Sequence, residues 1–168
     1  APQSALFHTA FVRCLAEVAE LPVGVLNSFC EQGSAGGECL VTSPDVDVLS
    51  FTGSSAVGRK IMMAASGTLK RLNLELGGKA PALVFDDCDI DMIAPQLAAA
   101  GMILGGQQCT ALSRILVHES CYDALAEALR KALGALPVGR SDDEFSKIGP
   151  LIDLRSRDRV HHLVETYA

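Results

Sequence analysis

The sequence lacks the patterns that mark membrane-spanning, disulfide-bonded and metal-binding proteins. Its longest nearly apolar stretch, Leu97–Leu104, is far too short to cross a bilayer, and its charges are scattered without a long run of one sign. None of the six cysteines forms a CxxC pair, and the adjacent His161 and His162 have poor geometry for chelation from one helix face. We therefore expect no metal site, no membrane partner, and reduced thiols in a cytoplasmic protein.

A strongly basic charge balance is also absent. The 168 residues carry a formal net charge of −6, which argues against nucleic acid as a partner. With 49% hydrophobic residues, the chain has the composition of one globular domain or of parts of two. Neither the GxGxxG dinucleotide fingerprint nor the Walker GxxxxGK[ST] pattern is present, and "LGGKAP" departs from the latter because Ala80 follows the lysine.

The first half of the sequence alternates helical and strand patterns. Helices are predicted over residues 5–20, 33–43 and 52–66, and strands over residues 25–30, 46–51 and 70–76. Strands that alternate with helices in this way imply right-handed crossovers and a parallel sheet.

The pattern restarts after the glycine pair Gly77–Gly78. Strands are predicted over residues 82–85 and 114–119, helices over 86–103, 120–136 and 153–168, and a loop over 138–151, with Asp153 as the N-cap of the last helix. The glycine pair is the best boundary between two substructures, residues 1–76 and 77–168. The predicted fold class is α/β.

The stretch "GGQQCTALSR" raises the question of whether Cys109 is a core residue, a redox thiol or a nucleophile. The residue alone leaves all three open, and a buried inert cysteine is the common case. The other cysteines lie in predicted helices or strands, where we expect them to act as small hydrophobic residues: Cys14, Cys30, Cys39, Cys88 and Cys121.

Two further stretches contain residues suited to chemistry. In "SFTGSSAVG", Gly53 permits close approach of a ligand and Ser54 stands where a helix begins, which suits a phosphate; the alternative is an ordinary strand-to-helix turn with a serine cap. In "LELGG", leucines flank Glu75, and desolvation would make this carboxylate a usable general base. The alternative is an edge-strand glutamate that faces water.

The ordered set "FTGSSAVGRKIM", "LELGGKAPALVFDD", "GQQCTALSRILVH", "YDAL" and "GPLID" resembles the aldehyde dehydrogenase superfamily. The resemblance runs over essentially the whole chain. It implies a Rossmann-like, parallel-sheet half domain over residues 1–76, the C-terminal half of the NAD(P)-binding domain. Residues 77–168 would then be the N-terminal part of a second α/β domain, the catalytic domain.

The resemblance also implies a role for each candidate residue. Cys109 would be the nucleophile, with its backbone N–H as an oxyanion donor, and Glu75 the general base. Gly53 and Ser54 would meet the cofactor pyrophosphate, and Gly77 would lie near the nicotinamide. The implied reaction oxidises an aldehyde to a carboxylic acid with NAD or NADP, in a parent protein that forms a homodimer or homotetramer.

Some family features are missing or altered. The oxyanion-hole asparagine and the ribose-binding lysine would precede Ala1, and an "E-x-F-G-P" motif would follow Ala168, so we expect the chain to be a portion of the enzyme that is inactive alone. Pro2 stands where the family often has a ribose-contacting glutamate, which leaves NADP possible. Leu104 replaces a common asparagine.

Two alternatives to an aldehyde dehydrogenase stay open at this point. The first is a truncated, non-catalytic homologue that acts as a scaffold or a partner-binding piece. The second is a relative that passes its acyl group to coenzyme A, against which Glu75 argues because that branch needs no hydrolytic base.

Overall fold

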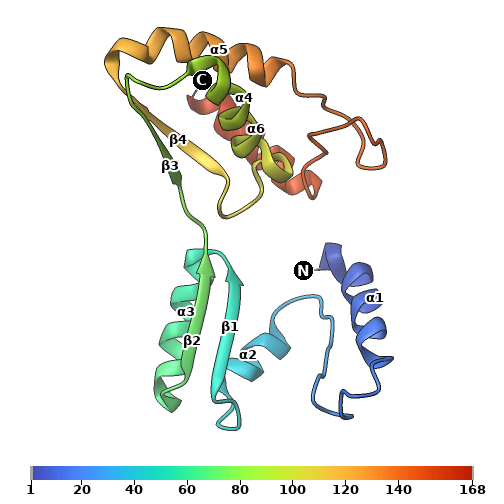
Figure 1. Cartoon of the computed structure of the whole chain (residues 1–168). Helices are drawn as coiled ribbons and strands as arrows, with labels where there is room; N and C mark the ends of the chain where they lie inside the picture. The colour runs from blue at the N-terminus through green and yellow to red at the C-terminus, as the bar shows by residue number, and fades with distance from the viewer. Residues whose placement is uncertain (1, 168) are drawn as a thin grey trace. The chain divides into compact units, whose positions relative to one another are not determined.

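The structure, a computed structural model, describes residues 2–167 and divides into two compact units. Unit 1 is Ala1–Glu75 and unit 2 is Leu76–Ala168. Each unit contains helices and a two-stranded sheet, so the predicted α/β class is confirmed (Figure 1). The assignment of the two units to a cofactor domain and a catalytic domain stays a prediction.

Unit 1 contains helices and a two-stranded sheet of β1 and β2, whose arrows run in the same direction, with α3 beside the sheet (Figure 1). Its elements are η1 (Pro2–Ser4), α1 (Ala5–Ala16), α2 (Ala35–Thr42), β1 (Val48–Gly53), α3 (Ser55–Ala65), η2 (Ser66–Thr68) and β2 (Arg71–Leu76), the last of which ends one residue into unit 2. Lys70 fixes the entry to β2, because its Nζ atom donates to the carbonyl oxygens of Ser43 and Val46. This contact anchors β2 to the loop that leads into β1.

The predicted strand over residues 25–30 is wrong. Both sheets of the described residues consist of other segments, so residues 25–30 have no strand beside them to complete a ladder. The segment instead begins with a turn in which the N–H of Val25 donates to the carbonyl of Pro22. Apolar and β-branched composition is not enough for a strand when no neighbouring strand is present to pair with it.

Unit 2 is built on a parallel pair, β3 and β4, that is connected through α4. Its elements are β3 (Ala80–Val84), α4 (Ile90–Met102), η3 (Ile103–Gly106), β4 (Leu112–Val117), η4 (Glu119–Cys121), α5 (Tyr122–Gly134) and α6 (Leu154–Tyr167). The register runs from Ala80 opposite Leu112 to Val84 opposite Val117, with an irregularity between Ala80 and Pro81. This strand–helix–strand crossover is the one that the sequence pattern predicts for the second half.

The core of unit 2 lies where α4 and α5 pack on each other and against β3. Val84, Ala94 and Leu125 are buried, and Leu125 is only 1% exposed. Half-buried residues complete the cluster: Cys88, Ile90, Ile93, Leu97, Ile115, Val117, Ala128 and Leu129. Unit 1 has a much smaller interior, since Gly58 and Ala65 of α3 are the residues buried there among those the structure describes.

Caps account for several differences between the predicted and observed helix ends. α4 begins at Ile90 rather than at residue 86, because the Asp89 carboxylate accepts a hydrogen bond from the N–H of Met92 at 3.1 Å. α1 ends at Ala16 rather than at residue 20. β4 covers residues 112–117 rather than 114–119, because His118 caps the short helix that follows it.

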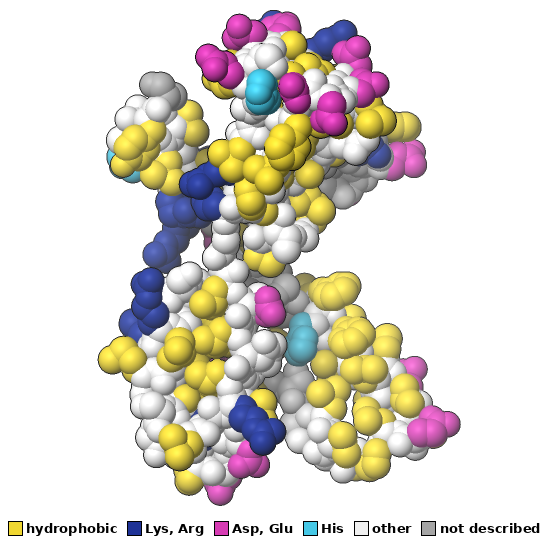
Figure 2. Space-filling model, turned by 60° about the vertical axis from the view of Figure 1, so that its left-hand side comes forward, with side chains coloured by type: hydrophobic (Ala, Val, Ile, Leu, Met, Phe, Trp, Pro, Cys, Tyr) yellow, Lys and Arg dark blue, Asp and Glu magenta, His cyan; other side chains and the backbone are white. Residues whose placement is uncertain are grey.

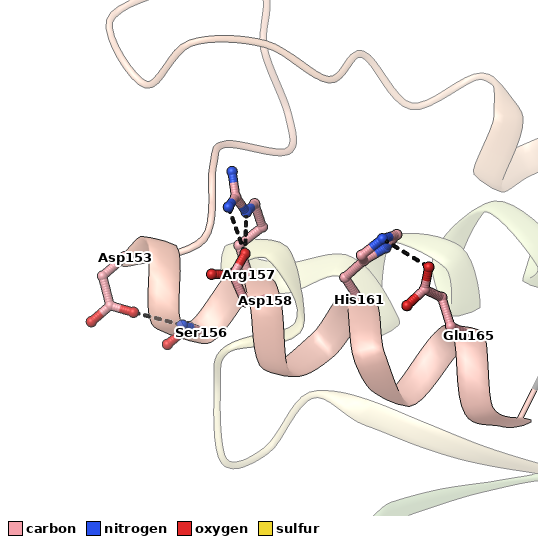
Figure 3. Close-up of polar contacts among 6 residues, drawn as sticks. All are labelled: Asp153, Ser156, Arg157, Asp158, His161 and Glu165. Atoms are coloured by element: carbon pink, nitrogen blue, oxygen red, sulfur yellow. Dashed lines mark hydrogen bonds and ion pairs between the residues drawn. The ribbon is translucent and has the colours of Figure 1, made fainter.

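The predicted cap of the last helix is confirmed. An Asp153 carboxylate oxygen accepts a hydrogen bond from the N–H of Ser156 at 2.7 Å, so α6 begins directly after it (Figure 3). Farther along α6, His161 Nε2 lies 3.3 Å from a carboxylate oxygen of Glu165, one helical turn away. The cap fixes the point at which the 149–153 segment gives way to helix.

The surface is far larger than that of a compact protein of this size. The accessible surface is 13136 Å², whereas a compact 17.7 kDa chain exposes about 7,900 Å², and two separate domains of half that mass about 4,800 Å² each. Figure 2 shows hydrophobic side chains spread over the visible surface, and Phe7, Val25 and Met63 are each more than half exposed. Unit 2 also has exposed apolar side chains, among them Phe145, Leu154 and Tyr167, so each unit exposes apolar surface.

Candidate functional site

Cys109 lies in a tight, solvent-exposed turn between η3 and β4. The turn closes through a hydrogen bond from the N–H of Ala111 to the carbonyl of Gln108 at 3.1 Å. Because the Cys109 side chain is exposed, it is not the buried, inert cysteine that is the common case. Its thiol is open to a reactant from solvent.

The other cysteines fit their predicted packing role only in part. Cys121 is buried and Cys88 is half-buried, as expected of small hydrophobic residues, whereas Cys14, Cys30 and Cys39 are exposed. The three exposed thiols belong to unit 1, where the small interior leaves them nothing to pack into. All six thiols are free in the part of the chain that the structure describes.

Three consecutive residues before the cysteine turn adopt left-handed backbone geometry. Leu104 has φ 50° and ψ 34°, and Gly105 and Gly106 have φ of 66° and 75°. Glycine adopts this region freely, but for an L-residue with a side chain it costs about 1–2 kcal/mol. Leu104 is thus a strained residue five positions before the thiol.

The Gln107 side chain bridges this left-handed turn to a distant segment of unit 2. Its Nε2 atom donates to the carbonyl oxygen of Leu104 at 2.8 Å, and its Oε1 atom accepts from the N–H of Ile152 at 2.8 Å. The backbone N–H of Gln107 also donates to the Leu104 carbonyl, at 3.3 Å. Sequence reasoning missed Gln107, although an amide beside a cysteine in a glycine-rich loop is a residue type that satisfies loop backbone groups.

Of the glycine pair after β2, Gly78 rather than Gly77 lies near the cysteine turn. A Cβ atom on Gly78 would lie 3.7 Å from the carbonyl oxygen of Cys109, whereas a Cβ atom on Gly77 would have no neighbour within 4 Å. Gly77 is therefore open, with no steric requirement for glycine. Its predicted place near a nicotinamide stays a prediction.

Of the two interpretations of Glu75, desolvation by the flanking leucines is wrong, and the alternative, a strand glutamate that faces water, agrees with the structure. On β2 the leucines Leu72, Leu74 and Leu76 are half-buried, while Asn73 and Glu75 are exposed. Successive side chains of a strand point to opposite faces, so the flanking leucines occupy one face and leave Glu75 on the other. Glu75 ends unit 1 and Cys109 belongs to unit 2, so a catalytic pair of the two stays a prediction.

The predicted phosphate turn has the expected strand–glycine–helix geometry. β1 ends at Gly53, and Ser54 is the N-cap of α3, its Oγ atom accepting from the N–H of Val57 at 3.3 Å. A Cβ atom on Gly53 would lie only 2.4 Å from Cζ of Phe51, so no larger residue fits without displacing that ring. The first-turn N–H groups of Ser55 and Ala56 have no intrahelical acceptors, as at any helix start.

The N-terminus of α2, another helix of unit 1, is already closed by a carboxylate. The Glu31 side chain accepts from the N–H of Gly36 at 2.7 Å and from that of Gly37 at 3.0 Å, and these two bonds lower its pKa below the ordinary value of 4.5. An incoming anion would meet a negative charge at α2, whereas the cap of α3 is the neutral Ser54 hydroxyl. Of these two helix starts, that of α3 thus suits a phosphate better.

Residues 2–167 offer neither a metal-binding cluster nor a membrane-spanning helix. No cluster of three or more His, Cys, Asp or Glu side chains in that range could hold a metal ion. In the same range, no helix is both long enough and apolar enough to cross a membrane.

The sequence profile of the aldehyde dehydrogenase family matches residues 1–168. The chain belongs to this family. A mitochondrial succinate-semialdehyde dehydrogenase of Arabidopsis thaliana is 41% identical to it over 151 residues, which make up 90% of this chain and 29% of the relative.

Solved structures agree with this family assignment. The HpcC structure from Thermus thermophilus is 36% identical, with a TM-score of 0.92, and the match covers 98% of this chain and 32% of that one. A mutant of aldehyde dehydrogenase C from Pseudomonas syringae, in complex with NAD+ and octanal, is 30% identical with a TM-score of 0.87, over 98% of this chain and 33% of that one. The chain thus spans about a third of the length of these relatives.

Proposed function

We propose that this chain carries the nucleophile and the general base of an NAD(P)-dependent aldehyde dehydrogenase, which oxidises an aldehyde to a carboxylic acid. The observation that carries the proposal is the exposed Cys109 thiol in a closed turn that follows the left-handed segment Leu104–Gly106, in which Leu104 is strained. The aldehyde dehydrogenase profile that matches the whole chain supports it. Strain that is held in place beside an exposed nucleophile is characteristic of functional sites.

In the proposed reaction, the Cys109 thiolate forms a C–S bond to the aldehyde carbon, and the carbonyl oxygen becomes the oxyanion of a thiohemiacetal. The backbone N–H of Cys109 donates a hydrogen bond to that oxyanion. A bound nicotinamide would supply the hydride acceptor, and loss of a hydride from the same carbon would leave a thioester on Cys109. Glu75 then takes a proton from water, the hydroxide adds to the thioester, and the C–S bond breaks to release the acid and the thiolate.

The residues at the start of α3 fit a dinucleotide phosphate. Ser54 offers a hydroxyl, and the N–H groups of Ser55 and Ala56 complete a donor set at the positive end of the helix. The Phe51 ring fills the space that a Cβ atom on Gly53 would need, so Gly53 would contribute only its backbone to the phosphate site. We assign the pyrophosphate to this turn. Gly77 remains the proposed neighbour of the nicotinamide.

We further propose that either NAD or NADP serves as cofactor, because the side chain of proline, at position 2, has no atom that accepts a hydrogen bond from a ribose hydroxyl. The proposed assembly is a homodimer or homotetramer of the full-length parent, in the cytoplasm. The NAD+ and octanal bound to the Pseudomonas relative support a nicotinamide cofactor and an aldehyde substrate.

The test follows formation of reduced cofactor by the intact protein that contains this chain, with a series of aldehydes and with each cofactor. Cys109→Ser should abolish turnover, while Cys14→Ser, which alters another exposed thiol, should not. Glu75→Gln should give a burst of reduced cofactor followed by slow turnover, because the base acts after hydride transfer. A complete lack of aldehyde oxidation by the unaltered protein would favour the non-catalytic scaffold instead.

Labelling of the thiols gives a second test that requires no substrate. Iodoacetamide at neutral pH should modify Cys109 ahead of Cys14, Cys30 and Cys39, although all four side chains are exposed. Exposure alone predicts similar rates, so preferential labelling requires a thiol that is activated as a nucleophile. Peptide mapping after partial labelling gives the order, and earlier labelling of Cys14 would count against Cys109 as the nucleophile.

A further inference from the structure

The structure assigns to Gln107 the role of a positioning residue that holds the cysteine turn in place; this inference rests on the proposed function of Cys109. Gln107 lies two positions before Cys109 and uses both ends of its amide. Nε2 donates to Leu104 and Oε1 accepts from Ile152, each at 2.8 Å. The two contacts join the segment just before the thiol to a segment 45 positions farther along the chain.

The hydrogen-bond partners fix the orientation of this amide. Rotation by half a turn would place the NH₂ group against the N–H of Ile152 and the oxygen against the carbonyl of Leu104, so that donor would face donor and acceptor would face acceptor. Only one orientation satisfies both partners. The side chain is therefore a directional link rather than a polar residue that adapts to its surroundings.

Gln107 also stabilises a backbone conformation that its neighbour disfavours. Leu104 has φ 50°, and its carbonyl oxygen accepts two hydrogen bonds, from the backbone N–H and from Nε2 of Gln107. A left-handed leucine persists only where its surroundings overdetermine it. Those two bonds are the contacts of the Leu104 carbonyl that hold it there.

Gly105 and Gly106, which connect Leu104 to the cysteine turn, are closely packed. A Cβ atom on Gly105 would lie 3.4 Å from Gln107 Nε2 and 3.7 Å from the carbonyl of Gly149, and one on Gly106 would lie 3.7 Å from the carbonyl of Gly101. Gly105 thus lies close to the Gln107 side chain and to the backbone of Gly149, next to the segment that Gln107 contacts through Ile152. Relaxation of Leu104 would shift the Cys109 backbone, and with it both the thiol and the N–H proposed to bind the oxyanion.

Gln108 provides a matched control. It is the same residue type in the same loop, and it donates from Nε2 to Thr110 Oγ1 at 2.8 Å, inside the cysteine turn itself. Gln107→Met and Gln108→Met each remove an amide while they keep the length of the side chain. Only the first breaks the link to Leu104 and Ile152.

The experiment measures steady-state kinetics, cofactor affinity and thermal unfolding of the intact protein and these two variants. Gln107→Met should lower kcat roughly 10- to 100-fold, the size expected from a small displacement of a reacting group, with KM for the aldehyde and Kd for the cofactor changed less than about twofold. Gln108→Met should lower kcat less than about threefold. Equal kcat values for the two variants, or a loss confined to KM, would overturn the inference.

The variant Leu104→Gly tests whether Gln107 affects the cysteine turn through the conformation of Leu104. Leu104→Gly removes the left-handed strain, so Gln107→Met should lower kcat much less in that background than in the unaltered protein. The same fold-loss in both backgrounds would overturn the role of Leu104. If Gln107→Met alone fails to fold, the double variant Leu104→Gly/Gln107→Met still tests the inference. Glycine at position 104 adopts the left-handed conformation without the hydrogen bonds of the Gln107 amide.

The activity of the unaltered protein separates the proposed function from the inference about Gln107. If it oxidises no aldehyde, the proposed function fails and the inference about Gln107 fails with it. If it is active and Cys109→Ser is not, the proposed function stands, and the comparison of Gln107→Met with Gln108→Met decides the inference alone.

Discussion

The phenyl ring of Phe51 lies over Gly53, two positions farther along β1, so closely that a Cβ atom on Gly53 would come within 2.4 Å of the ring's Cζ atom. Residues two apart on a strand share one face, so the ring occupies the space that a side chain at position 53 would need. Gly53 has no positive φ. Glycine is therefore required here for space and not for backbone conformation.

Gly53→Ala should displace the Phe51 ring and disturb the start of α3. We expect a loss of about 1 kcal/mol in unfolding free energy from overpacking and a roughly tenfold rise in the Kd of the dinucleotide. Denaturant unfolding and calorimetric titration of the intact protein measure the two effects. Gly67→Ala is the control, because a Cβ atom there would have no neighbour within 4 Å, and equal effects of both substitutions would contradict the steric argument.

Leu104→Asn should stabilise the protein. Asparagine tolerates the left-handed region better than leucine, so relief of the φ 50° conformation should raise the unfolding free energy by about 1 kcal/mol. The leucine side chain is 68% exposed, so little burial is lost. The midpoint of urea unfolding measures the gain.

Leu69 gives an independent check on the same argument. It has φ 53° and is 90% exposed, so Leu69→Asn should also stabilise. Leu116→Asn, on β4 with ordinary strand geometry and half exposed, should not. A loss of stability in both Leu104→Asn and Leu69→Asn would show that the left-handed leucines are not strained.

Acid should weaken unit 1 through Glu31. Two backbone N–H bonds, from Gly36 and Gly37, lower its folded-state pKa below the ordinary value of 4.5. A carboxylate with a depressed folded-state pKa stabilises the fold above its unfolded-state pKa, and this contribution is lost as the pH falls through the folded-state pKa. Stability should therefore fall below about pH 4.5.

Substitution distinguishes Glu31 from the other acidic residues. Glu31→Gln should make the stability of unit 1 depend less on pH in the acid range, whereas Glu144→Gln, a matched substitution in unit 2, should leave the acid response of unit 1 unchanged. Chemical unfolding followed by a probe in unit 1 between about pH 3 and pH 7, the span over which carboxylates titrate, gives both curves. An acid limb that persists in Glu31→Gln would assign the effect to another group.

Local signals were enough to predict the order of elements in unit 2 and the Asp153 cap. There the helical periodicity, the acidic residues before α4 and the pairing of β3 with β4 all agree. The same reasoning failed at residues 25–30, because a strand depends on a neighbour that composition does not specify. Glu75 shows the related error: leucines adjacent in sequence lie on the opposite face of the strand and do not bury it.

The family resemblance predicts that Cys109 lies in a functional loop. The sequence does not predict which residues contact that loop. The bond from Ile152 to Gln107 spans 45 positions, and no periodicity or motif reports a contact between two loops. The left-handed backbone of Leu104 also could not be predicted from the sequence. Leucine gives no turn signal, so only the structure reveals that the departure from the family's asparagine falls on a strained residue.

Hydrogen exchange should separate the two units. Unit 2 has the Val84, Ala94 and Leu125 core, whereas in unit 1 Gly58 and Ala65 are the buried residues among those described. Amides of β3, β4, α4 and α5 should therefore exchange much more slowly than those of α1 and α2, because opening of unit 2 exposes more apolar surface. Mass spectrometry of the 168-residue chain measures both sets of peptides in one experiment.

A core substitution shows whether that protection comes from the cluster. Leu125 is 1% exposed, so Leu125→Ala should cost about 2–5 kcal/mol and speed exchange throughout unit 2 while leaving the peptides of α1 and α2 unchanged. Leu133→Ala, on the same helix but 41% exposed, should cost less than half as much. Similar protection of α1 and α5 in the unaltered chain would contradict the argument, because it would mean that unit 1 draws stability from contacts other than its own small interior.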